Sequence, residues 1–489
     1  MPLILPGNVA SATAGAYEVA NSCRFNDGDT AYMHKTNGST GSQTTWTFSC
    51  WVKRGALGAQ QDIFACLDDT SNYTHLRIKS DDTVELDNYS GGSNTARLTT
   101  NRKLRDCGAW YNLVWVADTT NGTAGDRIRL YINGTEETSF GTDTQPSSSA
   151  SLFLNQDKKH TLGRNEYNSG SSYFDGYLAE VCFIDGTALT ASSFGEFDDD
   201  SPMIWKPVDV SGLTFGTNGF YLDFEDSSNL GNDANGGTDL TEVNLAATDQ
   251  AVDSPTNNFC TWNPLIRNMS TYAYSEGNLS VNTSSSHEAA YGSAFSNFGM
   301  TAGKWYAEFK ITANADDVFI GVSSNLEDDI LGSSDSAYTF SYKGNGWAYY
   351  GSDGKVQHTD SDTWLTYGSS LSNNDIVGVA LDLDNLELYF SVNGTWQNSG
   401  DPTSGATKTG GVVNGGAKAL NGSGSTGTWW FCASDNSQTT VCTVEANFGS
   451  PMNTISSGNA DDNGYGNFEY DVPAGYLALC TQNLGSDGG

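Results

Sequence analysis

Two short runs each hold a pair of carboxylates, the type of side chain that hydrolyses glycosidic bonds when two of them lie close together. They are Glu85-Leu86-Asp87 and Glu196-Phe197-Asp198. In each run the acids are two residues apart, so both side chains lie on one face if the run forms a β-strand. Two carboxyl groups about 5 to 9 Å apart carry out acid–base or nucleophilic catalysis in glycoside hydrolases. Such a pair would make the protein a glycan-active enzyme.

The sequence contains no recognisable machinery for nucleophilic or phosphate chemistry. It has no Gly-x-Ser-x-Gly elbow, no phosphate-binding Walker loop and no His-Glu-x-x-His zinc motif. The five histidines share no pattern; they are His34, His75, His160, His287 and His358. We therefore expect a protein that is not an enzyme.

Calcium is the one metal whose ligand chemistry recurs in the sequence, because carboxylate and amide oxygens occur in short clusters. One cluster follows the start of an EF-hand loop, although position twelve of that loop is Tyr470. A second cluster comes directly after the apolar run 63–67. The predicted calcium ligands are Asp68, Asp69, Asn459, Asp461 and Asn463. The alternative is that these side chains only shape turns by hydrogen bonding to nearby backbone.

Aromatic residues in the second half of the chain give the best indication of a binding surface. Sugar rings stack on aromatic side chains while Asn and Asp bind their hydroxyls. The predicted ligand-binding residues are Trp347, Tyr349, Tyr350, Trp364 and Trp396. The alternative is packing within the sheets, because Tyr and Trp are ordinary strand residues.

The charge balance excludes several classes of partner. The chain has 23 Lys and Arg against 58 Asp and Glu, a net charge of −35. A surface this acidic repels nucleic acid and anionic lipid, so we expect neither as a partner. Charged residues are nevertheless only 17% of the chain, against about 25% in typical proteins. The surface must therefore consist largely of Ser, Thr, Asn and Gly.

The cysteines and the N-terminus indicate folding in a reducing cytoplasm. The cysteines are odd in number, widely spaced and without a Cys-x-x-Cys pair, so neither disulfides nor zinc are expected. They are Cys23, Cys50, Cys66, Cys107, Cys182, Cys260, Cys432, Cys442 and Cys480. We expect no secretory signal, since no Lys or Arg precedes Arg24 and the first apolar run is only three residues long.

Short alternating strands separated by turn residues recur along the whole chain and predict an all-β protein. Residues 46–53 and 304–311 each alternate as half-buried antiparallel strands do. Asn133-Gly134 and Asn393-Gly394 each follow an alternating strand and predict a hairpin with a type I′ turn. We predict two antiparallel jelly-roll-type sandwiches in tandem. The predicted divisions are an N-terminal arm at 1–20, a sandwich at 21–225, a linker at 226–268 and a sandwich at 269–489.

The first sandwich resembles the laminin-G-like, concanavalin-A-like jelly-roll family. Residues 46–53 look like its early core strand, residues 110–116 and 129–134 like its central hairpin, and residues 162–164, 174–181 and 189–190 like its closing segment. This family includes glycan hydrolases, and its glucanase branch uses a Glu-x-Asp-x-x-Glu strand. Neither Glu85-Leu86-Asp87 nor Glu196-Phe197-Asp198 continues to a third acid at the right position.

The second sandwich resembles the SPRY family. The matching segments are residues 303–309, 318–322, 375–382, 388–394 and 446–449. SPRY domains are non-catalytic interaction modules that bind through loops at one end of a bent β-sandwich. The resemblance implies a fold and a mode of binding without naming a ligand.

The whole chain also resembles fibre-like structural proteins of marine tailed phages, through its opening residues 3–13 and 20–27. We therefore expect a non-catalytic virion surface protein, a tail or head fibre that binds a glycan or protein of the host surface. Its expected partners are other virion proteins, through the N-terminal arm, and further copies of itself. The alternatives are a capsid decoration protein and, third, a glycan-active enzyme.

Overall fold

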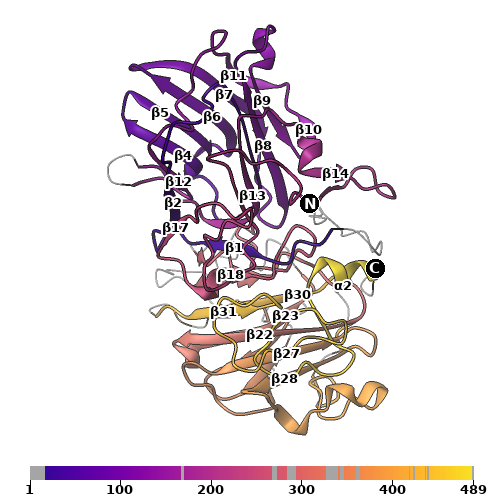
Figure 1. Ribbon diagram of the computed structural model, residues 1–489. Helices are drawn as coiled ribbons and strands as arrows, with labels where there is room; N and C mark the ends of the chain where they lie inside the picture. The colour runs from indigo at the N-terminus through magenta and orange to yellow at the C-terminus, as the bar shows by residue number, and fades with distance from the viewer. Residues whose placement is uncertain are drawn as a thin grey trace. The chain divides into compact units, whose positions relative to one another are not determined.

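The computed structural model describes residues 17–166, 170–266, 272–283, 293–325, 340–341, 346–358, 364–417, 419–421, 425–435, 437 and 440–486. The chain divides into two compact units, which we call the N-terminal unit (Thr13–Asn258) and the C-terminal unit (Phe259–Gly489). Almost all regular structure in both is antiparallel β-sheet, which confirms the predicted all-β class (Figure 1). No helix within the described ranges is long and apolar enough to cross a membrane.

The N-terminal unit is a sandwich of two eight-stranded sheets. Sheet A has the order β10 (Thr135–Glu136), β9 (Ile128–Ile132), β8 (Trp110–Asp118), β3 (Thr45–Arg54), β13 (Gly176–Asp185), β1 (Ser22–Phe25) and β18 (Gln250–Ala251), with β16 (Phe220–Leu222) paired to β13. Sheet B has the order β11 (Phe140–Thr144), β7 (Ser93–Lys103), β6 (Thr83–Ser90), β5 (Asn72–Ile78), β4 (Gln61–Asp69), β12 (Lys159–Leu162), β2 (Tyr32–Thr36) and β17 (Thr241–Val243). A small hairpin joins β14 (Gly195–Phe197) to β15 (Trp205–Pro207), and the 3-10 helices are η1 (Ala124–Asp126), η3 (Ala191–Ser193) and η4 (Ala247–Asp249).

The C-terminal unit is a second sandwich. Sheet C has the order β19 (Ala273–Ser275), β20 (Ser280–Asn282), β31 (Thr443–Asn447), β22 (Lys304–Ala313), β27 (Ile376–Asp382), β28 (Glu387–Val392) and β29 (Thr395–Trp396), with β32 (Leu477–Ala478) paired to β22. Sheet D has the order β21 (Ser293–Phe295), β30 (Trp430–Asp435), β23 (Val318–Ser323), β24 (Gly346–Tyr350), β25 (Lys355–His358) and β26 (Trp364–Thr366). Helices are η5 (Ala315–Asp317), η6 (Gln397–Ser399), η7 (Pro402–Thr407) and α2 (Thr481–Ser486).

The two predicted Asn-Gly hairpins are confirmed. Asn133 and Gly134 join β9 to β10, with φ of 48° and 75°. Asn393 and Gly394 join β28 to β29, with φ of 49° and 76°. Two successive positive φ angles define the type I′ turn, which Asn and Gly adopt at least cost.

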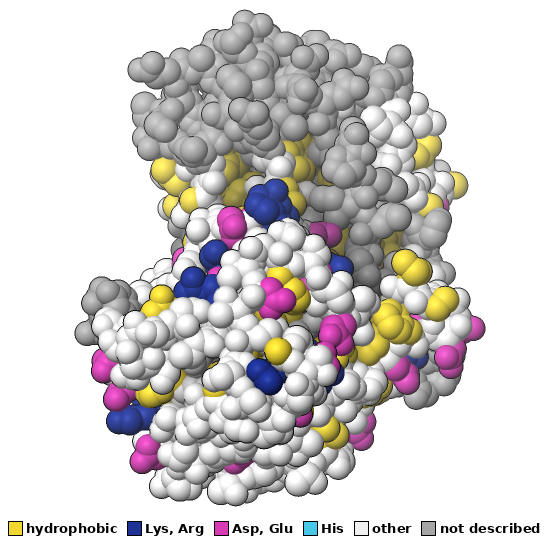
Figure 2. Space-filling view, turned by 90° about the horizontal axis from the view of Figure 1, so that it is seen from above, with side chains coloured by type: hydrophobic (Ala, Val, Ile, Leu, Met, Phe, Trp, Pro, Cys, Tyr) yellow, Lys and Arg dark blue, Asp and Glu magenta, His cyan; other side chains and the backbone are white. Residues whose placement is uncertain are grey.

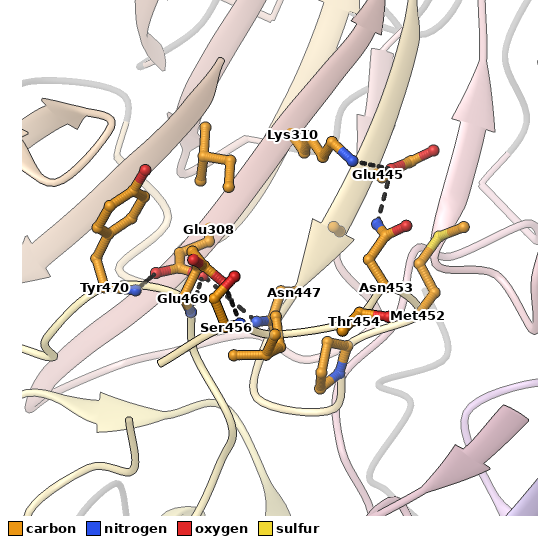
Figure 3. Close-up of a pocket in the computed structure, with 14 residues that line it drawn as sticks. Glu308, Lys310, Glu445, Asn447, Met452, Asn453, Thr454, Ser456, Glu469 and Tyr470 are labelled. Carbon is orange, nitrogen blue, oxygen red and sulfur yellow. Dashed lines mark hydrogen bonds and ion pairs between the residues drawn. The ribbon is translucent and has the colours of Figure 1, made fainter. Parts of the chain in front are cut away.

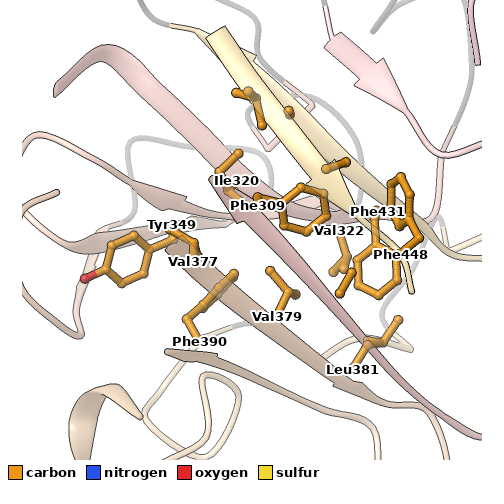
Figure 4. Packing of buried hydrophobic residues seen from close by; sticks show 14 of the residues in the cluster. Phe309, Ile320, Val322, Tyr349, Val377, Val379, Leu381, Phe390, Phe431 and Phe448 are labelled. Atoms are coloured by element: carbon orange, nitrogen blue, oxygen red, sulfur yellow. The ribbon is translucent and has the colours of Figure 1, made fainter. Parts of the chain in front are cut away.

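Alternation along β3 and β22 directs one set of side chains into each core. Trp46, Phe48, Cys50 and Val52 lie in the core between sheets A and B. On β22 the corresponding set is Trp305, Ala307, Phe309 and Ile311, and Figure 4 shows Phe309 packed with Phe431 and Phe448 in the core between sheets C and D. These faces were predicted correctly.

The prediction that both strands are only half-buried is wrong. The opposite face of β3 carries Trp51 and Lys53, each about 1% exposed. Trp51 packs in a second apolar cluster with residues of the segment between β13 and β16, such as Trp205 and Phe215. In the C-terminal unit, Tyr306 on β22 packs in the same way beneath residues 468–480. Each central sheet is therefore covered on both faces, on one of them by irregular chain.

The predicted linker at 226–268 is wrong. Leu230 and Leu240 are buried in the core of the N-terminal unit, and β17 and β18 pair with β2 and β1. The Lys53 ammonium forms a buried ion pair with Asp253 (2.6 Å). Residues 259–262 pack instead in the cores of the C-terminal unit. Single apolar residues spaced among turn residues give no periodic pattern, so the sequence did not predict that this segment packs in the N-terminal unit.

The predicted N-terminal arm, 1–20, is wrong for its last four residues, and residues 1–16 lie outside the described part of the chain. Val19 is buried, and its amide donates a hydrogen bond to Thr256 Oγ1 (3.0 Å). The Tyr17 hydroxyl donates to Glu180 Oε2 (3.1 Å) and lies 3.1 Å from the Tyr221 hydroxyl. Residues 17–20 therefore belong to the N-terminal unit.

Charged side chains are sparse on the described part of the face seen in Figure 2. On the face seen in Figure 2, backbone and uncharged polar side chains predominate, and Lys, Arg, Asp and Glu form small separate groups. This matches a chain in which only 17% of residues are charged.

Glu308 is expected to fasten the C-terminal covering segment to sheet C. This buried carboxylate accepts hydrogen bonds from the backbone amides of Glu469 and Tyr470, both at 2.9 Å, and from the Tyr306 hydroxyl (3.1 Å). Glu308→Ala leaves these donors buried and unpaired, so we expect a loss of about 2 to 4 kcal/mol of unfolding free energy. Urea denaturation measures the loss. The exposed control Asp316→Ala should change it by less than about 0.5 kcal/mol, and equal effects of the two variants would contradict this role.

Glu180 should make the stability of the N-terminal unit depend on pH. Burial raises its pKa from 4.5 to about 8, with Asp223 and Glu225 acting in the same direction. The folded state therefore keeps a proton that the unfolded state releases above pH 4.5, and stability falls as pH rises towards 8, by at most about 1.4 kcal/mol per pH unit. Glu180→Gln cannot ionise, so its melting temperature should fall less between pH 5 and pH 9 than that of the wild type. The exposed control Glu136→Gln should keep the wild-type slope; a wild-type slope in Glu180→Gln would refute the assignment.

Candidate functional site

The predicted aromatic site does not form as a single surface. Trp347 and Tyr349 are fully buried in the core of the C-terminal unit, so their assignment to a binding surface is wrong. Both lie on β24, whose alternation turns them inward and turns Tyr350 outward. Burial of a large aromatic side chain in the middle of a sheet stabilises the fold, because it removes apolar surface from water.

The remaining predicted aromatic residues lie in two places. Tyr350 and Trp364 pack together on sheet D, with ring centroids 5.4 Å apart, and Trp364 is 37% exposed. Trp396 is half-buried on sheet C and packs edge-on against Tyr306 at 6.4 Å. The structure thus keeps only Tyr350 and Trp364 as an accessible pair.

The predicted calcium ligands already have protein partners. Asp461 Oδ1 accepts from the amides of Asn463 and Tyr465, and its Oδ2 accepts from the Ala478 amide and the Asn483 side chain, at 2.7 to 2.9 Å. The Asn459 side chain donates to backbone carbonyls. These hydrogen bonds fix the conformation of the turn that contains Asp461.

The other predicted pair lies on β4. Asp68 forms an ion pair with Lys158 (3.0 Å), and Asp69 accepts from the Ser71 amide (2.7 Å). Across the described ranges, no three His, Cys, Asp or Glu side chains group as a metal site would require. Calcium binding at either predicted cluster stays a prediction from the sequence.

Of the two carboxylate runs, Glu85-Leu86-Asp87 lies at the centre of a polar sheet surface. Its strand β6 and the neighbours β5 and β7 alternate, and Leu76, Leu86 and Leu98 point into the core. The residues between them therefore lie on the opposite face of sheet B. We call this surface the polar face; it comprises Asp62, Tyr73, His75, Arg77, Glu85, Asp87, Tyr89, Arg97 and Thr99.

Hydrogen bonds hold the two acids of this run in place. Arg77 donates twice to Glu85 Oε1 (2.9 and 2.6 Å) and once to Asp87 Oδ2 (3.0 Å). Thr99 donates to the other oxygen of Glu85 (2.6 Å), and Arg97 to the other oxygen of Asp87 (3.0 Å). Both carboxylates are at most 2% exposed. Every oxygen of the pair thus accepts at least one hydrogen bond from a neighbouring side chain.

Asp62 and His75 are two neighbouring groups of the polar face whose pKa values are shifted by burial. Asp62 Oδ2 accepts from the Asn165 side chain (2.8 Å), and its Oδ1 lies 3.4 Å from His75 Nδ1. Burial raises the pKa of Asp62 to about 6, although the positive charge of Arg77 opposes the shift. Burial, aided by Arg77, lowers the pKa of His75 to about 3. The imidazole is therefore neutral at physiological pH.

Aromatic rings form a stacked row beside these charges. The rings of His75 and Tyr73 are stacked at 4.5 Å, and those of Tyr73 and Tyr89 at 4.8 Å. The guanidinium of Arg97 lies 5.9 Å from the centre of the Tyr89 ring. The rings lie on β5 and β6, and Arg97 on the adjacent β7 contacts Tyr89 as well as Asp87.

A pocket of about 460 Å³ opens on the polar face. Its wall combines hydroxyls, amides, aromatic rings and one aliphatic side chain, contributed by Gln60, Leu67, Thr70, Tyr73, His75, Arg77, Tyr89, Asn165, Ser171 and Ser172. Sequence reasoning missed this site apart from Glu85 and Asp87. One sequence signal could have indicated the polar face. Residues 73–77 and 85–89 carry a polar or aromatic residue at every second position, and they lie on two strands that pair.

A second hollow, of about 200 Å³, lies in the C-terminal unit (Figure 3). Lys310 is 3.9 Å from Glu445, which also accepts from the Asn453 side chain (2.7 Å). Glu469 accepts from the Ser456 amide (2.7 Å). The charged groups labelled in Figure 3 all have protein partners, and the hollow is less than half the volume of the pocket on the polar face.

Arg77 is expected to be essential to the stability of the polar face, because it neutralises two buried carboxylates. Removal of one partner from a buried ion pair typically costs about 3 to 5 kcal/mol, so Arg77→Leu should destabilise the N-terminal unit by that amount. Chemical denaturation, monitored by hydrogen exchange in peptides of this unit, measures the loss of unfolding free energy. Lys79→Leu, which removes a half-exposed cation 3.7 Å from Glu85, should cost less than about 1 kcal/mol. A cost below 1 kcal/mol for Arg77→Leu would show that the network is not structural.

Comparison with known proteins identifies part of the chain. Residues 27–193 match the model of the concanavalin A-like lectin/glucanases superfamily. No curated protein matches the chain significantly.

Similar solved structures include both families that the sequence resembles. The SPRY domain of human HERC1 has 15% identity, covers 38% of this chain and 96% of its own, and gives a TM-score of 0.26. Domains LG4–5 of the mouse laminin α1 chain have 11% identity, cover 81% of this chain and 82% of their own, and give 0.29. The CBM40 of Ruminococcus gnavus IT-sialidase, solved with α2,3-sialyllactose, has 15% identity, covers 32% and 94%, and gives 0.25. The family that residues 27–193 match is the one predicted for the first sandwich.

Proposed function

We propose that the protein is a non-catalytic carbohydrate-binding protein that holds a glycan in the pocket of the polar face. The observation that carries this proposal is the composition of that pocket, in which amides, hydroxyls and aromatic rings surround a space of about 460 Å³. Pockets that bind small ligands have volumes of about 300 to 1,000 Å³ and combine apolar walls with a few placed polar groups. The match of residues 27–193 to a lectin and glucanase superfamily supports the same class of ligand.

The hydrogen bonding of the carboxylates supports binding rather than hydrolysis. A glycosidase needs one carboxyl group that donates a proton and a second that attacks or activates water. Glu85 and Asp87 are instead held by Arg77, Arg97 and Thr99. Asp62 is fully buried. We therefore place these acids in the support of the pocket, where they fix the rings and the guanidinium groups.

We extend the proposal to location: the protein is a virion surface protein, a tail or head fibre, that presents this pocket to glycans of the host. The support is the resemblance of its opening residues to phage fibre-like proteins, together with buried cysteines that form no disulfide, such as Cys23, Cys50 and Cys182. Unpaired cysteines suit assembly in a reducing cytoplasm. Many copies on one particle would multiply a modest affinity per site.

Blocking the pocket should abolish binding. Thr70 is exposed at the rim, so Thr70→Trp fills the entrance without disturbing the core. On a glycan array followed by calorimetry with the best ligand, we expect at least a ten-fold loss of affinity, about 1.4 kcal/mol. The matched control Thr135→Trp, exposed at the far edge of sheet A, should bind as the wild type does. Failure of the wild type to bind any glycan, or wild-type affinity in Thr70→Trp, would refute the proposed site.

Two further measurements separate the alternatives. Incubation with the bound polysaccharide should release no reducing sugar; release would make the protein an enzyme. Localisation of the chain on purified particles should place it on a projecting fibre. A location flat on the capsid, with a rise in particle melting temperature, would instead make it a decoration protein.

A further inference from the structure

The imidazole of His75, which lines the pocket of the polar face, carries a buried hydrogen-bond donor that no described residue uses. Arg77 Nη1 lies 2.9 Å from His75 Nδ1. A guanidinium only donates, so Nδ1 accepts and the ring proton is on Nε2. Nε2 has no hydrogen-bond partner among the described residues, although His75 is only 5% exposed and lines the pocket. A buried donor without a partner costs free energy, which a ligand oxygen at this position would recover.

This donor carries no charge in the physiological range. Burial and the neighbouring Arg77 lower the pKa of His75 to about 3. The titratable and charged groups that face it are Tyr73 and Arg77 on β5, Asp62 on β4, Glu85 and Asp87 on β6, and Arg97 on β7. The ring thus offers a neutral N–H between pH 5 and pH 9.

The guanidinium groups around the pocket already have carboxylate partners. Arg77 is bound to Glu85 and Asp87, and Arg97 to Asp87. An anionic ligand would find no uncompensated cation among these groups and would approach three buried carboxylates, within a chain of net charge −35. Charge therefore disfavours an acidic sugar at this site and leaves an uncharged one unaffected.

We propose that the pocket selects uncharged glycans through the charges around it and that His75 binds the sugar by donating its Nε2–H to a hydroxyl or carbonyl oxygen. The proposal rests on the proposed function, glycan binding at the polar face. Sites that donate a hydrogen bond to a sugar oxygen discriminate strongly against ligands that lack it, because the buried donor is then left unpaired.

A glycan array with the full chain tests the class of ligand. It should carry uncharged gluco-, manno- and chito-oligosaccharides, oligo-uronates and sulfated galactans. We expect the uncharged group to bind at least ten-fold more tightly than either acidic group. Preferential binding of uronates or sulfated sugars would overturn the inference and leave the proposed function standing, whereas binding of none of them would overturn the proposed function itself.

Two substitutions at one position test the role of His75. His75→Gln keeps an N–H donor and an acceptor for Arg77, and His75→Phe keeps the planar ring without either. With the best uncharged oligosaccharide, His75→Gln should remain within about three-fold of the wild type, and His75→Phe should bind at least ten-fold more weakly. Equal affinities of His75→Phe and the wild type would overturn the role of this donor. Melting curves of both variants establish that they fold.

The pH profile of the wild type provides a test that does not depend on the folding of a variant. With an uncharged ligand and a neutral His75, affinity should change less than about three-fold between pH 5 and pH 8. A ligand held by its negative charge would bind markedly more tightly on acidification, as Asp62 gains its proton near pH 6. Such a rise would overturn the inference.

Discussion

Buried carboxylates that accept several hydrogen bonds hold this protein together where hydrophobic packing does not reach. Glu308 binds two backbone amides of the C-terminal segment, and Glu387 binds the amides of Leu388, Val413 and Asn414. Asp461 accepts hydrogen bonds from the amides of Asn463 and Ala478 and from the side chain of Asn483. Backbone N–H groups of irregular chain must be paired when they are buried. A charged acceptor pairs several of them at once and forms stronger bonds than a neutral group.

This constraint explains how each unit buries both faces of a central sheet. A sandwich needs only the face between its two sheets, and that face follows the alternation of residues such as Trp46 and Phe309. The outer faces of β3 and β22 are covered by long segments with little regular structure. Each segment contributes scattered apolar residues and is fastened by buried ionic groups, as in the pair of Lys53 and Asp253. Among the described residues, 15 of the 58 acidic residues of the chain are buried in this way or in similar networks.

The polar face uses the same chemistry for a different purpose. On sheet B, Glu85 and Asp87 accept hydrogen bonds from side chains instead of backbone amides. The result is a rigid layer of guanidinium groups and stacked rings on an open sheet surface. A pre-ordered surface of this kind loses little conformational entropy when a ligand binds. The free donor of His75 depends on this order, since Arg77 selects the tautomer of its ring.

The sequence by itself determined the all-β class, the two sandwiches, the Asn-Gly hairpins and the inward faces of β3 and β22, because alternation and turn chemistry are local properties of the chain. It also placed Glu85 and Asp87 on one face of one strand. Only the tertiary structure decided that residues 226–258 belong to the N-terminal unit and that Trp347 is buried while Trp364 is exposed. It alone joined His75, Asp87 and Arg97, which lie on three strands. Pairing register and the covering of a sheet by distant chain depend on contacts between remote segments, and no local pattern of residues encodes them.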